Sequence, residues 1–281
     1  MVYSMTKVIA DIGATGSKFA ILHNGKDPVF KTAEGFNPFQ KDLSVLSGIL
    51  DELPVTQKDV KSVHLFGAGF TTETIPTIQT MTETTFGNAS TIELGDDMLG
   101  TCKAHAPQNQ QAVITAIGTG TCHALWDGSS IAKQVPALGF ILGDHGSGAH
   151  IGRDILEAGL IQDLTGDAKK AFDHQVTGYS DIKNYINQPS IVATWARLAS
   201  SYKERPEIQT ILRKNFKNLA ENVLKDRYNK LNLPHIMVGS ISNVFKTEVR
   251  TALQDVGISN DNIRFSNKST IQGLAQKYAY Q

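Results

Sequence analysis

Two segments of the chain, 105 positions apart, join a hydrophobic run to a turn of glycine and threonine. Residues 8–17 read VIADIGATGS, and residues 113–122 read VITAIGTGTC. Glycine lets a ligand come close to the backbone, and successive backbone N–H groups in such a turn can surround an anion. The repeat therefore predicts two phosphate-binding turns, although two ordinary hairpin turns would give the same pattern. Asp11 in the first copy is replaced by Ala116 in the second.

Three aspartates stand where strands are expected to end or helices to begin. Asp11 closes an apolar strand, Asp97 starts a helix, and Asp144 lies just ahead of a helix expected to begin near Ser147. Carboxylates at such positions can hold a magnesium ion or accept a proton from a hydroxyl. They can also simply cap a turn or a helix, so the sequence leaves these roles open.

The stretch GDHGSGAHIGR, which contains Asp144, is open to two further interpretations. Its glycines give a GxGxxxG pattern, but no strand with a following acidic partner supports a dinucleotide site. Asp144, His145 and His150 could hold a metal ion, but their spacing does not match HExxH and places the two rings on different sides of a helix. The sequence therefore supports neither interpretation strongly.

The elements expected around these residues follow the same order twice. The first half predicts strands, helices and turns in the order βββαβαβα over residues 7–13, 18–24, 27–32, 40–53, 60–69, 71–85, 90–95 and 97–105. After the polar stretch APQNQQ, the opening recurs with strands over 112–118, 122–128 and 130–136. A helical section over about 147–231 follows, and then a βαβα ending over 235–280. The repeat is therefore of a whole α/β domain.

Composition sets the broad class of protein. A chain of 281 residues exceeds the usual size of a single core, which predicts two domains. Its 27 basic and 27 acidic residues balance, which argues against nucleic acid as the main partner. The sequence has no apolar run of membrane-spanning length and no leader pattern, so we expect a cytoplasmic protein without a membrane partner. Its two cysteines, Cys102 and Cys122, suit a reducing compartment.

Several motifs together carry a family resemblance. DIGATGSK at residues 11–18 resembles the first phosphate motif of the actin, Hsp70 and sugar-kinase superfamily, and AIGTGT at 116–121 resembles the second. LGFILGDHGSGAHIGR at 138–153 is similar to the LGDEGSG signature of the BadF/BadG/BcrA/BcrD ATPase family, N-acetylglucosamine kinase type. VGSIS at 238–242 resembles its adenosine motif. LGDDMLG and GFNPF also resemble segments of the bacterial kinases, so the match covers nearly the whole chain.

The resemblance implies an α/β fold made of duplicated ribonuclease H-like, actin-like ATPase domains around a central cleft. Each domain would hold a mixed five-stranded sheet in βββαβαβα order. The expected N-terminal domain covers residues 1–107, and the C-terminal helix at about 268–281 would pack back on it. The expected C-terminal domain covers 108–267, with a helical insertion at about 160–231 for which the sequence assigns no functional residues.

The resemblance implies an ATP-dependent kinase that transfers the γ-phosphoryl group of Mg-ATP to a hydroxyl of an amino sugar, first of all N-acetylglucosamine. Asp97 would be the catalytic base, and Asp11 would orient Mg²⁺ through water. The remaining nucleotide-binding residues would be Gly13, Ala14, Thr15, Lys18, Gly118, Thr119, Gly120, Thr121, Gly239 and Ser240. The sugar would contact Asn37, Asp97, Cys122 and Asp144. Lys18 could equally be an exposed strand lysine, and VGSIS an ordinary strand–helix joint.

The sequence departs from the family pattern at two positions. His145 stands where relatives commonly have glutamate, and Cys122 stands where the N-acetylglucosamine kinases have an asparagine that contacts the sugar. Cysteine does not offer the same donor and acceptor pair, which weakens the assignment to N-acetylglucosamine.

Three alternatives to the kinase therefore stay open. One is an ATPase subunit that drives a partner, and another is a sugar- or nucleotide-binding protein that has lost catalysis. The third, ranked lower, is an activator ATPase that uses Cys102 and Cys122 for an iron–sulfur cluster. Related proteins often form homodimers, which the residues of this chain do not by themselves indicate.

Overall fold

The structure is a computed structural model of the chain, and it describes residues 6–176, 179–221, 224, 228 and 232–279. The chain forms two compact units. Unit 1 consists of Met1–Ala106 together with Lys268–Gln281, and unit 2 of Pro107–Asn267. None of the described helices is long and apolar enough to cross a membrane.

Unit 1 is built on a mixed five-stranded sheet in the order β3-β2-β1-β4-β5. Strands β1, β2 and β3 form an antiparallel meander, whereas β4 and β5 run parallel to β1. The elements in chain order are β1 (Thr6–Ile12), β2 (Gly16–His23), β3 (Val29–Glu34), α1 (Leu43–Asp51), β4 (Val60–Gly67), α2 (Ile75–Thr85), β5 (Thr91–Asp96), α3 (Asp97–His105) and α13 (Thr270–Ala279).

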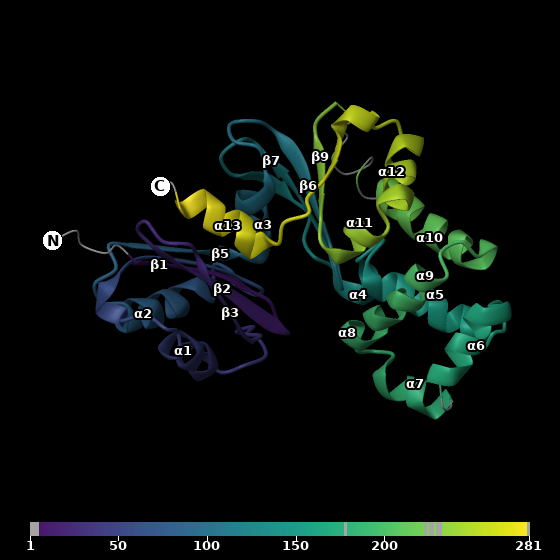
Figure 1. Ribbon diagram of the computed structural model, residues 1–281, viewed down its shortest axis with the longest axis horizontal. Helices are drawn as coiled ribbons and strands as arrows, with labels where there is room; N and C mark the ends of the chain where they lie inside the picture. The colour runs from purple at the N-terminus through teal and green to yellow at the C-terminus, as the bar shows by residue number, and fades with distance from the viewer. Residues whose placement is uncertain (1–5, 177–178, 222–223, 225–227, 229–231, 280–281) are drawn as a thin grey trace. The chain divides into compact units, whose positions relative to one another are not determined.

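Two apolar clusters hold the sheet of unit 1 between helices. Helices α1 and α2 pack on one face around Val8, Phe19 and Leu46. Helices α3 and α13 cover the other face, where Ile9, Leu22 and Phe66 meet Leu274 (Figure 1). Alternate residues of a strand point to opposite faces, which explains why the neighbours Val8 and Ile9 belong to different clusters. The last helix of the described chain therefore completes the core of the N-terminal unit.

Unit 2 repeats the same sheet. Its strand order is β10-β9-β6-β7-β8, which matches unit 1 when β6 is set against β1 and β9 against β4. Strands β6 and β7 and strands β7 and β8 are antiparallel, and β9 is parallel to both β6 and β10. The strands are β6 (Ala112–Ile117), β7 (Thr121–Trp126), β8 (Ile131–Gln134), β9 (His235–Val238) and β10 (Ile263–Phe265).

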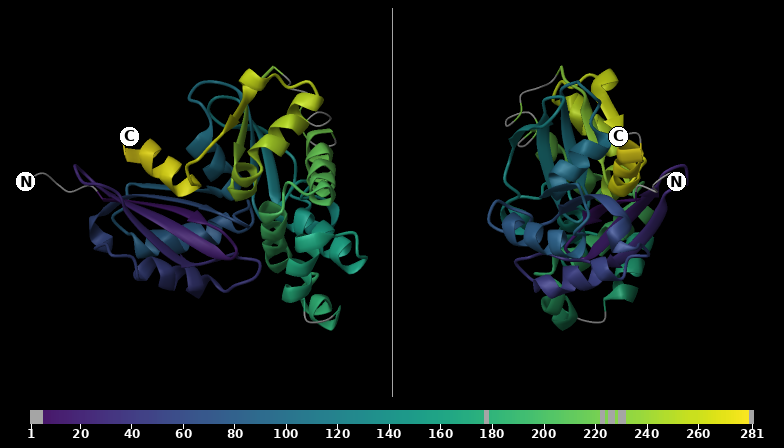
Figure 2. Two further views of the ribbon diagram at one scale, coloured as in Figure 1. Left: turned by 45° about the vertical axis from the view of Figure 1, so that its right-hand side comes forward. Right: turned by 90° about the vertical axis from the view of Figure 1, so that its left-hand side faces the viewer.

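A helical segment between β8 and β9 distinguishes unit 2 from unit 1. Its largely buried helix α5 packs against the later helices, and α6 to α9 extend from it away from the sheet (Figures 1 and 2). The helices between β8 and β9 are α4 (Gly139–Leu142), α5 (Gly148–Leu160), α6 (Gly166–Gln175), α7 (Tyr179–Tyr185), α8 (Pro189–Val192), α9 (Ala196–Ser201) and α10 (Pro206–Leu219). Helices α11 (Ser240–Val244) and α12 (Lys246–Asp255) follow β9. Short 3₁₀ turns lie at Gln57–Asp59, Ala193–Trp195 and Asn260–Asn262.

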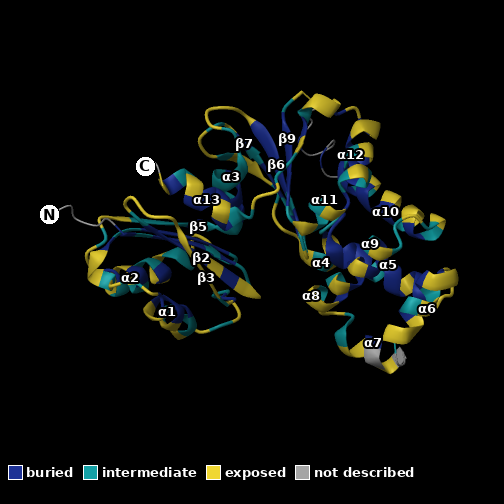
Figure 3. Cartoon of the chain, in the orientation of Figure 1, coloured by how far each residue is buried: buried dark blue, intermediate teal, exposed yellow. Residues whose placement is uncertain are grey.

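The predicted fold class and its duplicated five-stranded sheets are confirmed. Burial follows the position of the strands in each sheet: the central strands β1 and β6 are mostly buried, whereas the edge strand β3 is mostly exposed (Figure 3). Two local predictions differ in detail. The helix expected from residue 71 begins at Ile75, and the long helical section is broken into several short helices. Helix α4 forms in a stretch for which no element was predicted.

Candidate active site

The first glycine turn lies at the carboxyl end of β1. The Gly13 amide donates to the Gly16 carbonyl at 3.0 Å, and the Gly13 carbonyl accepts from the Phe36 amide at 3.0 Å. Among the described hydrogen bonds of this turn, the amides of Ala14 and Thr15 donate to no protein acceptor. Two successive N–H groups of this kind are suited to an anion.

Asp11 lies two residues before Gly13, directly opposite Lys18 in the antiparallel pair of β1 and β2. Burial raises the pKa of Asp11 to about 6, and this exceeds the opposite effect of the Lys18 charge. The charge of Asp97 adds to the increase, so the two carboxylates lie within electrostatic reach of one another. A mostly buried carboxylate with a neighbouring acid is a good site for a cation, because a positive charge would offset both the desolvation of the carboxylate and its repulsion by the neighbouring acid.

Asp97 is the first residue of α3, but it is not the residue that caps the helix. Asp96 is the N-cap, and its Oδ1 accepts from the Leu99 amide at 2.6 Å. The carboxylate of Asp97 is not the N-cap and interacts instead with the backbone amides of Met98 and of Asp97 itself. Its pKa is raised, first by burial and then by the charge of Asp96, which increases its tendency to accept a proton.

Asn37 lies beside the residues that follow β4. Its Oδ1 accepts from the Phe39 amide at 3.0 Å, and a Cβ at Gly69 would lie 2.6 Å from that oxygen. Gly69 follows the carboxyl end of β4, just as Asp11 and Asp97 mark the carboxyl ends of β1 and β5. The predicted residues of unit 1 therefore gather along one edge of its sheet, where α/β folds commonly bind ligands.

The second glycine turn lies at the equivalent end of β6. The Gly118 amide donates to the Gly120 carbonyl at 2.9 Å, and the amides of Thr119 and Gly120 donate to no acceptor among the described hydrogen bonds of the turn. Helix α5 supports the turn from behind, because the amides of Gly148 and Ala149 donate to the carbonyls of Gly118 and Thr119 at 2.8 and 3.1 Å. These two helix amides are thus not available to a ligand.

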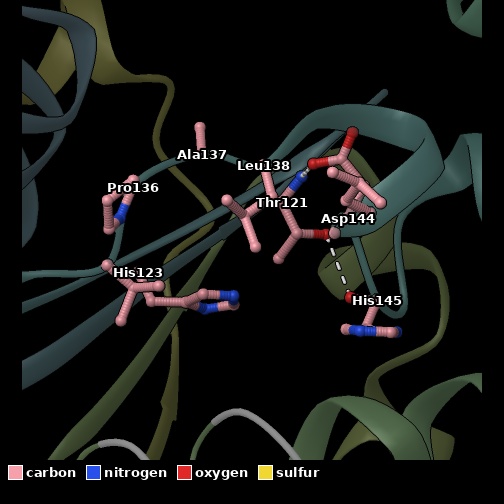
Figure 4. A pocket seen from close by; sticks show the side chains of 10 residues that line it. Thr121, His123, Pro136, Ala137, Leu138, Asp144 and His145 are labelled. Carbon is pink, nitrogen blue, oxygen red and sulfur yellow. Dashed lines mark hydrogen bonds between the residues drawn. The ribbon is translucent and has the colours of Figure 1, made fainter.

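Asp144 is held against this turn. Its Oδ1 accepts from the Thr121 amide at 2.9 Å, and the Thr121 hydroxyl donates to the His145 carbonyl at 3.1 Å (Figure 4). Asp144 has a φ of 55°, a left-handed conformation that is uncommon for a residue other than glycine and is often found at functional sites. Thr121 thus holds the turn against Asp144 and His145, whereas Thr119 is exposed.

The alternative interpretations of GDHGSGAHIGR lose support. His150 Nε2 lies 2.8 Å from the Phe140 carbonyl, to which it must donate, and burial lowers the pKa of His150. This nitrogen is therefore not available as a metal ligand. The glycine at position 152 is explained by packing and not by a dinucleotide site, because a Cβ there would lie 2.0 Å from the Val192 carbonyl oxygen.

Gly239 and Ser240 follow β9 and begin α11. Gly239 has a φ of 106°, and a Cβ at this position would lie 2.3 Å from the Ile117 carbonyl oxygen, so a glycine is required here. The Ser242 hydroxyl is buried and donates to the Gly239 carbonyl at 2.9 Å, whereas Ser240 is exposed. The close approach places the start of α11 beside the second glycine turn.

A pocket of about 500 Å³ joins this turn to α11. One wall is the stretch 190–201, which runs through α8 and α9, and the other contains Ser240, Ile241 and Val244. Gly118 and Thr119 also line the pocket. Of the described residues that line it, Arg197 is the only charged one, and its side chain belongs to an exposed residue of α9. The volume is in the range typical of small-ligand sites.

Sequence reasoning missed this second wall. The helical section was read as core, but a signal was present in the order Ser190, Ala193, Thr194, Arg197 and Ser201. These residues recur at spacings of three and four, which places small and polar side chains on one side of a helical segment. A core-facing stripe would have carried larger apolar residues.

The carboxylates of unit 1 suit a magnesium ion by their chemistry. Among the described residues, no group of three or more His, Cys, Asp or Glu side chains is placed to hold a metal ion. Magnesium in phosphate-transfer sites needs no such cage, because water and substrate phosphates supply most of its ligands and one or two carboxylates suffice. Asp11, with Asp97 nearby, meets that requirement.

Several solved protein structures are similar to this one. The structure matches a protein from Porphyromonas gingivalis described as a "Putative N-acetylglucosamine Kinase" with a TM-score of 0.86 and 26% identity, over 98% of this chain and 99% of that one. A second protein of that description, from Chromobacterium violaceum, matches with a TM-score of 0.71 and 19% identity over 99% and 100% of the two chains.

More distant matches include a ROK family glucokinase from Streptomyces griseus in complex with glucose and AMPPNP. The TM-score is 0.61 at 12% identity, over 97% of both chains. No protein-family model matches the sequence, and no curated protein is significantly similar to it. The chain therefore has the fold of sugar kinases of the actin-like superfamily over its whole described length.

Proposed function

We propose that the chain is an ATP-dependent sugar kinase that transfers the γ-phosphoryl group of Mg-ATP to a hydroxyl of an amino sugar. The observation that carries the proposal is the full-length match to the Porphyromonas gingivalis protein, whose description names N-acetylglucosamine kinase. The two glycine turns and the two raised-pKa aspartates supply, at the matching sheet edges, the parts that phosphoryl transfer requires. The LGDHGSG segment supports the BadF/BadG group within this class.

The nucleotide occupies the pocket of unit 2 in this proposal. The phosphates lie toward Gly118 and Thr119, where the amides of Thr119 and Gly120 can donate to phosphate oxygens. The nucleoside lies between α11 and the α8–α9 wall, with Ile241 and Val244 offering apolar surface to the base. Arg197 supplies the positive charge of this wall.

Mg²⁺ bound with ATP neutralises charge that develops on the phosphates during transfer. In the proposal Asp11 would hold the ion through water. The amides of Ala14 and Thr15, which have no protein acceptor among the described hydrogen bonds of their turn, would donate to a phosphate oxygen. Ala116, at the position in β6 that corresponds to Asp11, keeps the second turn uncharged. Only one turn thus carries a carboxylate toward the polyphosphate.

Asp97 accepts the proton of the sugar hydroxyl as it attacks the γ-phosphorus. A partly buried carboxylate with a raised pKa is better matched to this proton than an ordinary surface aspartate. Asn37 and Asp144 bind the sugar, and Cys122 lies in β7 next to the second turn. N-acetylglucosamine is the first acceptor to test, with N-acetylmuramate and glucosamine next, because Cys122 and His145 depart from the family pattern.

A panel assay tests the proposal directly. ADP release is followed with Mg-ATP and each amino sugar in turn, and the phosphorylated product is identified by mass spectrometry. Turnover that requires one of the sugars supports the kinase. Sugar-independent turnover would instead favour an ATPase subunit, and nucleotide binding without any turnover would favour a binding protein that has lost catalysis.

The iron–sulfur alternative loses support from the position of Cys102. This residue is 0% exposed, and burial raises the pKa of its thiol to about 12. A thiol so buried does not suit a cluster shared between subunits, which needs an accessible thiolate from each.

A further inference from the structure

One carboxylate in unit 1 joins four elements of the fold. The Oε2 of Glu93 on β5 accepts from His64 Nδ1 of β4 at 2.8 Å and from the Tyr278 hydroxyl of α13 at 2.5 Å. Its Oε1 lies 2.5 Å from Lys103 Nζ of α3. The three donors come from three different elements, and the chemistry proposed above does not use Glu93.

The surroundings of Glu93 fix its partners closely. The ring of Tyr278 stacks on that of His64 with centroids 3.9 Å apart, and His64 Nε2 lies 2.5 Å from the Ser62 hydroxyl. The side chain of His64 is 7% exposed and that of Glu93 is 29% exposed. Although burial opposes ionisation, the three hydrogen bonds outweigh it and lower the pKa of Glu93 to about 2. The group is therefore a charged acceptor throughout the physiological range.

Helix α3 needs such support because its own apolar surface is small. Its sequence, DMLGTCKAH, has Met98, Leu99 and Cys102 as its only larger apolar residues. Helix α13 supplies most of the remaining contact. It packs so closely on α3 that a Cβ at Gly273 would lie 2.6 Å from the Ala104 carbonyl oxygen. Without α13, α3 would have to hold its position on the sheet with few contacts of its own.

We propose that Glu93 is a positioning residue for Asp97, because its carboxylate locks α13 and α3 to the sheet that carries the active-site edge. Glu93 lies four residues before Asp97 on the strand that runs directly into α3, and Lys103 lies six residues after it on that helix. The lock thus holds the chain on both sides of the proposed base. This inference rests on the proposed function, in which Asp97 accepts the proton of the sugar.

The test compares two variants of the lock with one control. Tyr278→Phe removes a single hydroxyl and leaves the ring stack on His64, and Glu93→Gln keeps the shape of the side chain but removes its charge. Asp51→Asn is the matched control, since Asp51 accepts from Gln57 at 2.7 Å on α1, which covers the opposite face of the same sheet. All three variants are made in the full chain.

The first readout is hydrogen exchange of the amides in residues 96–105, measured by mass spectrometry without substrates. We expect about tenfold faster exchange in both lock variants and no change in Asp51→Asn. The second readout is kinetic, at a temperature well below unfolding. We expect kcat to fall about tenfold while KM for ATP and for the sugar stays within about twofold, because displacement of a base slows the chemical step.

Unchanged exchange in both lock variants would overturn the inference, whatever the activity. Faster exchange with unchanged kcat would also overturn it, because the network would then stabilise α3 without affecting Asp97. A wild-type protein with no sugar-dependent turnover would defeat the proposed function and with it the catalytic part of the inference. The exchange data would still show whether the lock exists, so the two failures are distinguishable. If Glu93→Gln does not fold, Tyr278→Phe alone decides.

Discussion

The two glycine turns are built alike and differ in charge. Each ends the strand at the centre of a five-stranded sheet, and each leaves two successive amides without a protein acceptor among the described residues, Ala14 and Thr15 in one and Thr119 and Gly120 in the other. Two strand residues earlier, the first copy pairs Asp11 with Lys18, whereas the second pairs Ala116 with Cys122.

The difference teaches how a duplicated scaffold can divide one task. In the proposed kinase, the backbone amides of either turn attract phosphate, and they need only glycine and a tight bend to do so. A carboxylate attracts the cation but repels the phosphate, so a second one would cost more than it adds. The elements behind the turns differ as well, because the first is braced by Phe36 and the second by the start of α5.

The largest effect is expected when the proposed base, Asp97 of unit 1, is removed. Asp97→Asn keeps the size of the side chain but cannot accept a proton, so we expect turnover to fall by about 10² to 10⁴ with folding intact. Steady-state kinetics and circular dichroism measure the two quantities. Asp96→Asn serves as a comparison, since Asp96 caps α3 and should mainly affect stability. Retained turnover in Asp97→Asn would remove Asp97 from the role.

The difference in charge between the two turns can be tested by introducing a carboxylate next to the second turn. Ala116→Asp should lower kcat/KM for Mg-ATP by about tenfold to a hundredfold, because an added negative charge near the phosphates costs a few kcal/mol. The double variant Ala116→Asp with Cys122→Lys copies the cross-strand pair of the first turn and should recover part of the loss. An unchanged kcat/KM for Mg-ATP in the single variant would contradict the division of charge.

The pocket wall that only unit 2 possesses gives a third prediction. Arg197→Ala should raise KM for ATP about tenfold, with KM for the sugar and kcat unchanged, because the lost contact is made equally in the ground state and in the transition state. Arg197→Lys should be intermediate, since it keeps the charge but not the planar guanidinium. The same comparison with adenosine and ADP in binding titrations separates a contact with the base from a contact with the phosphates.

Two glycines of unit 2 should respond in opposite ways to the same change. Gly239→Ala introduces a left-handed alanine and a clash with Ile117, so we expect it to lower the free energy of unfolding by about 1–3 kcal/mol or more. Gly118→Ala meets nothing within 4 Å and should fold normally while weakening nucleotide binding. Urea denaturation and nucleotide titration together check the pair, and equal stability losses would contradict it.

The smallest effect concerns pH. The folded pKa of Asp11, about 6, exceeds its ordinary value of 3.8, so the folded state is penalised once Asp11 ionises. The penalty is complete above pH 6 and disappears as the pH falls toward 4. We therefore expect Asp11→Asn to raise the Tm relative to wild type more at pH 7.5 than at pH 4.5, by on the order of 2–4 °C. Subtracting wild type removes the contribution of His105, whose lowered pKa acts in the same range.

The sequence was a good guide to the sheets because period-two burial and glycine turns are local signals. The strands around Asp11 and those around Gly118 follow the expected order, and α3 and α13 lie where helices were predicted. The helical section was harder to interpret. Its breaks at Pro189 and Pro206 start new helices, but which side each helix buries depends on contacts with α5 that are distant in sequence.

The candidate site shows the same limit. A motif could point to Asp11, Asp97 and the glycines, because residue types and their spacing can be recognised in the sequence. It could not show that Asp96, and not Asp97, takes the capping role, or that the Thr121 hydroxyl is engaged by His145. The position of Glu93 among donors from three other elements depends entirely on tertiary packing.

The return of α13 to unit 1 has a consequence for biosynthesis. When residues 1–106 have emerged from the ribosome, the sheet face containing Ile9, Leu22 and Phe66 is partly covered by α3 but still lacks α13, and all of unit 2 must be translated before α13 appears. The nascent N-terminal half therefore carries an exposed apolar face for the duration of that synthesis, and such a face is a binding surface for chaperones. An isolated fragment ending at Ala106 would keep this face exposed and would be prone to aggregate.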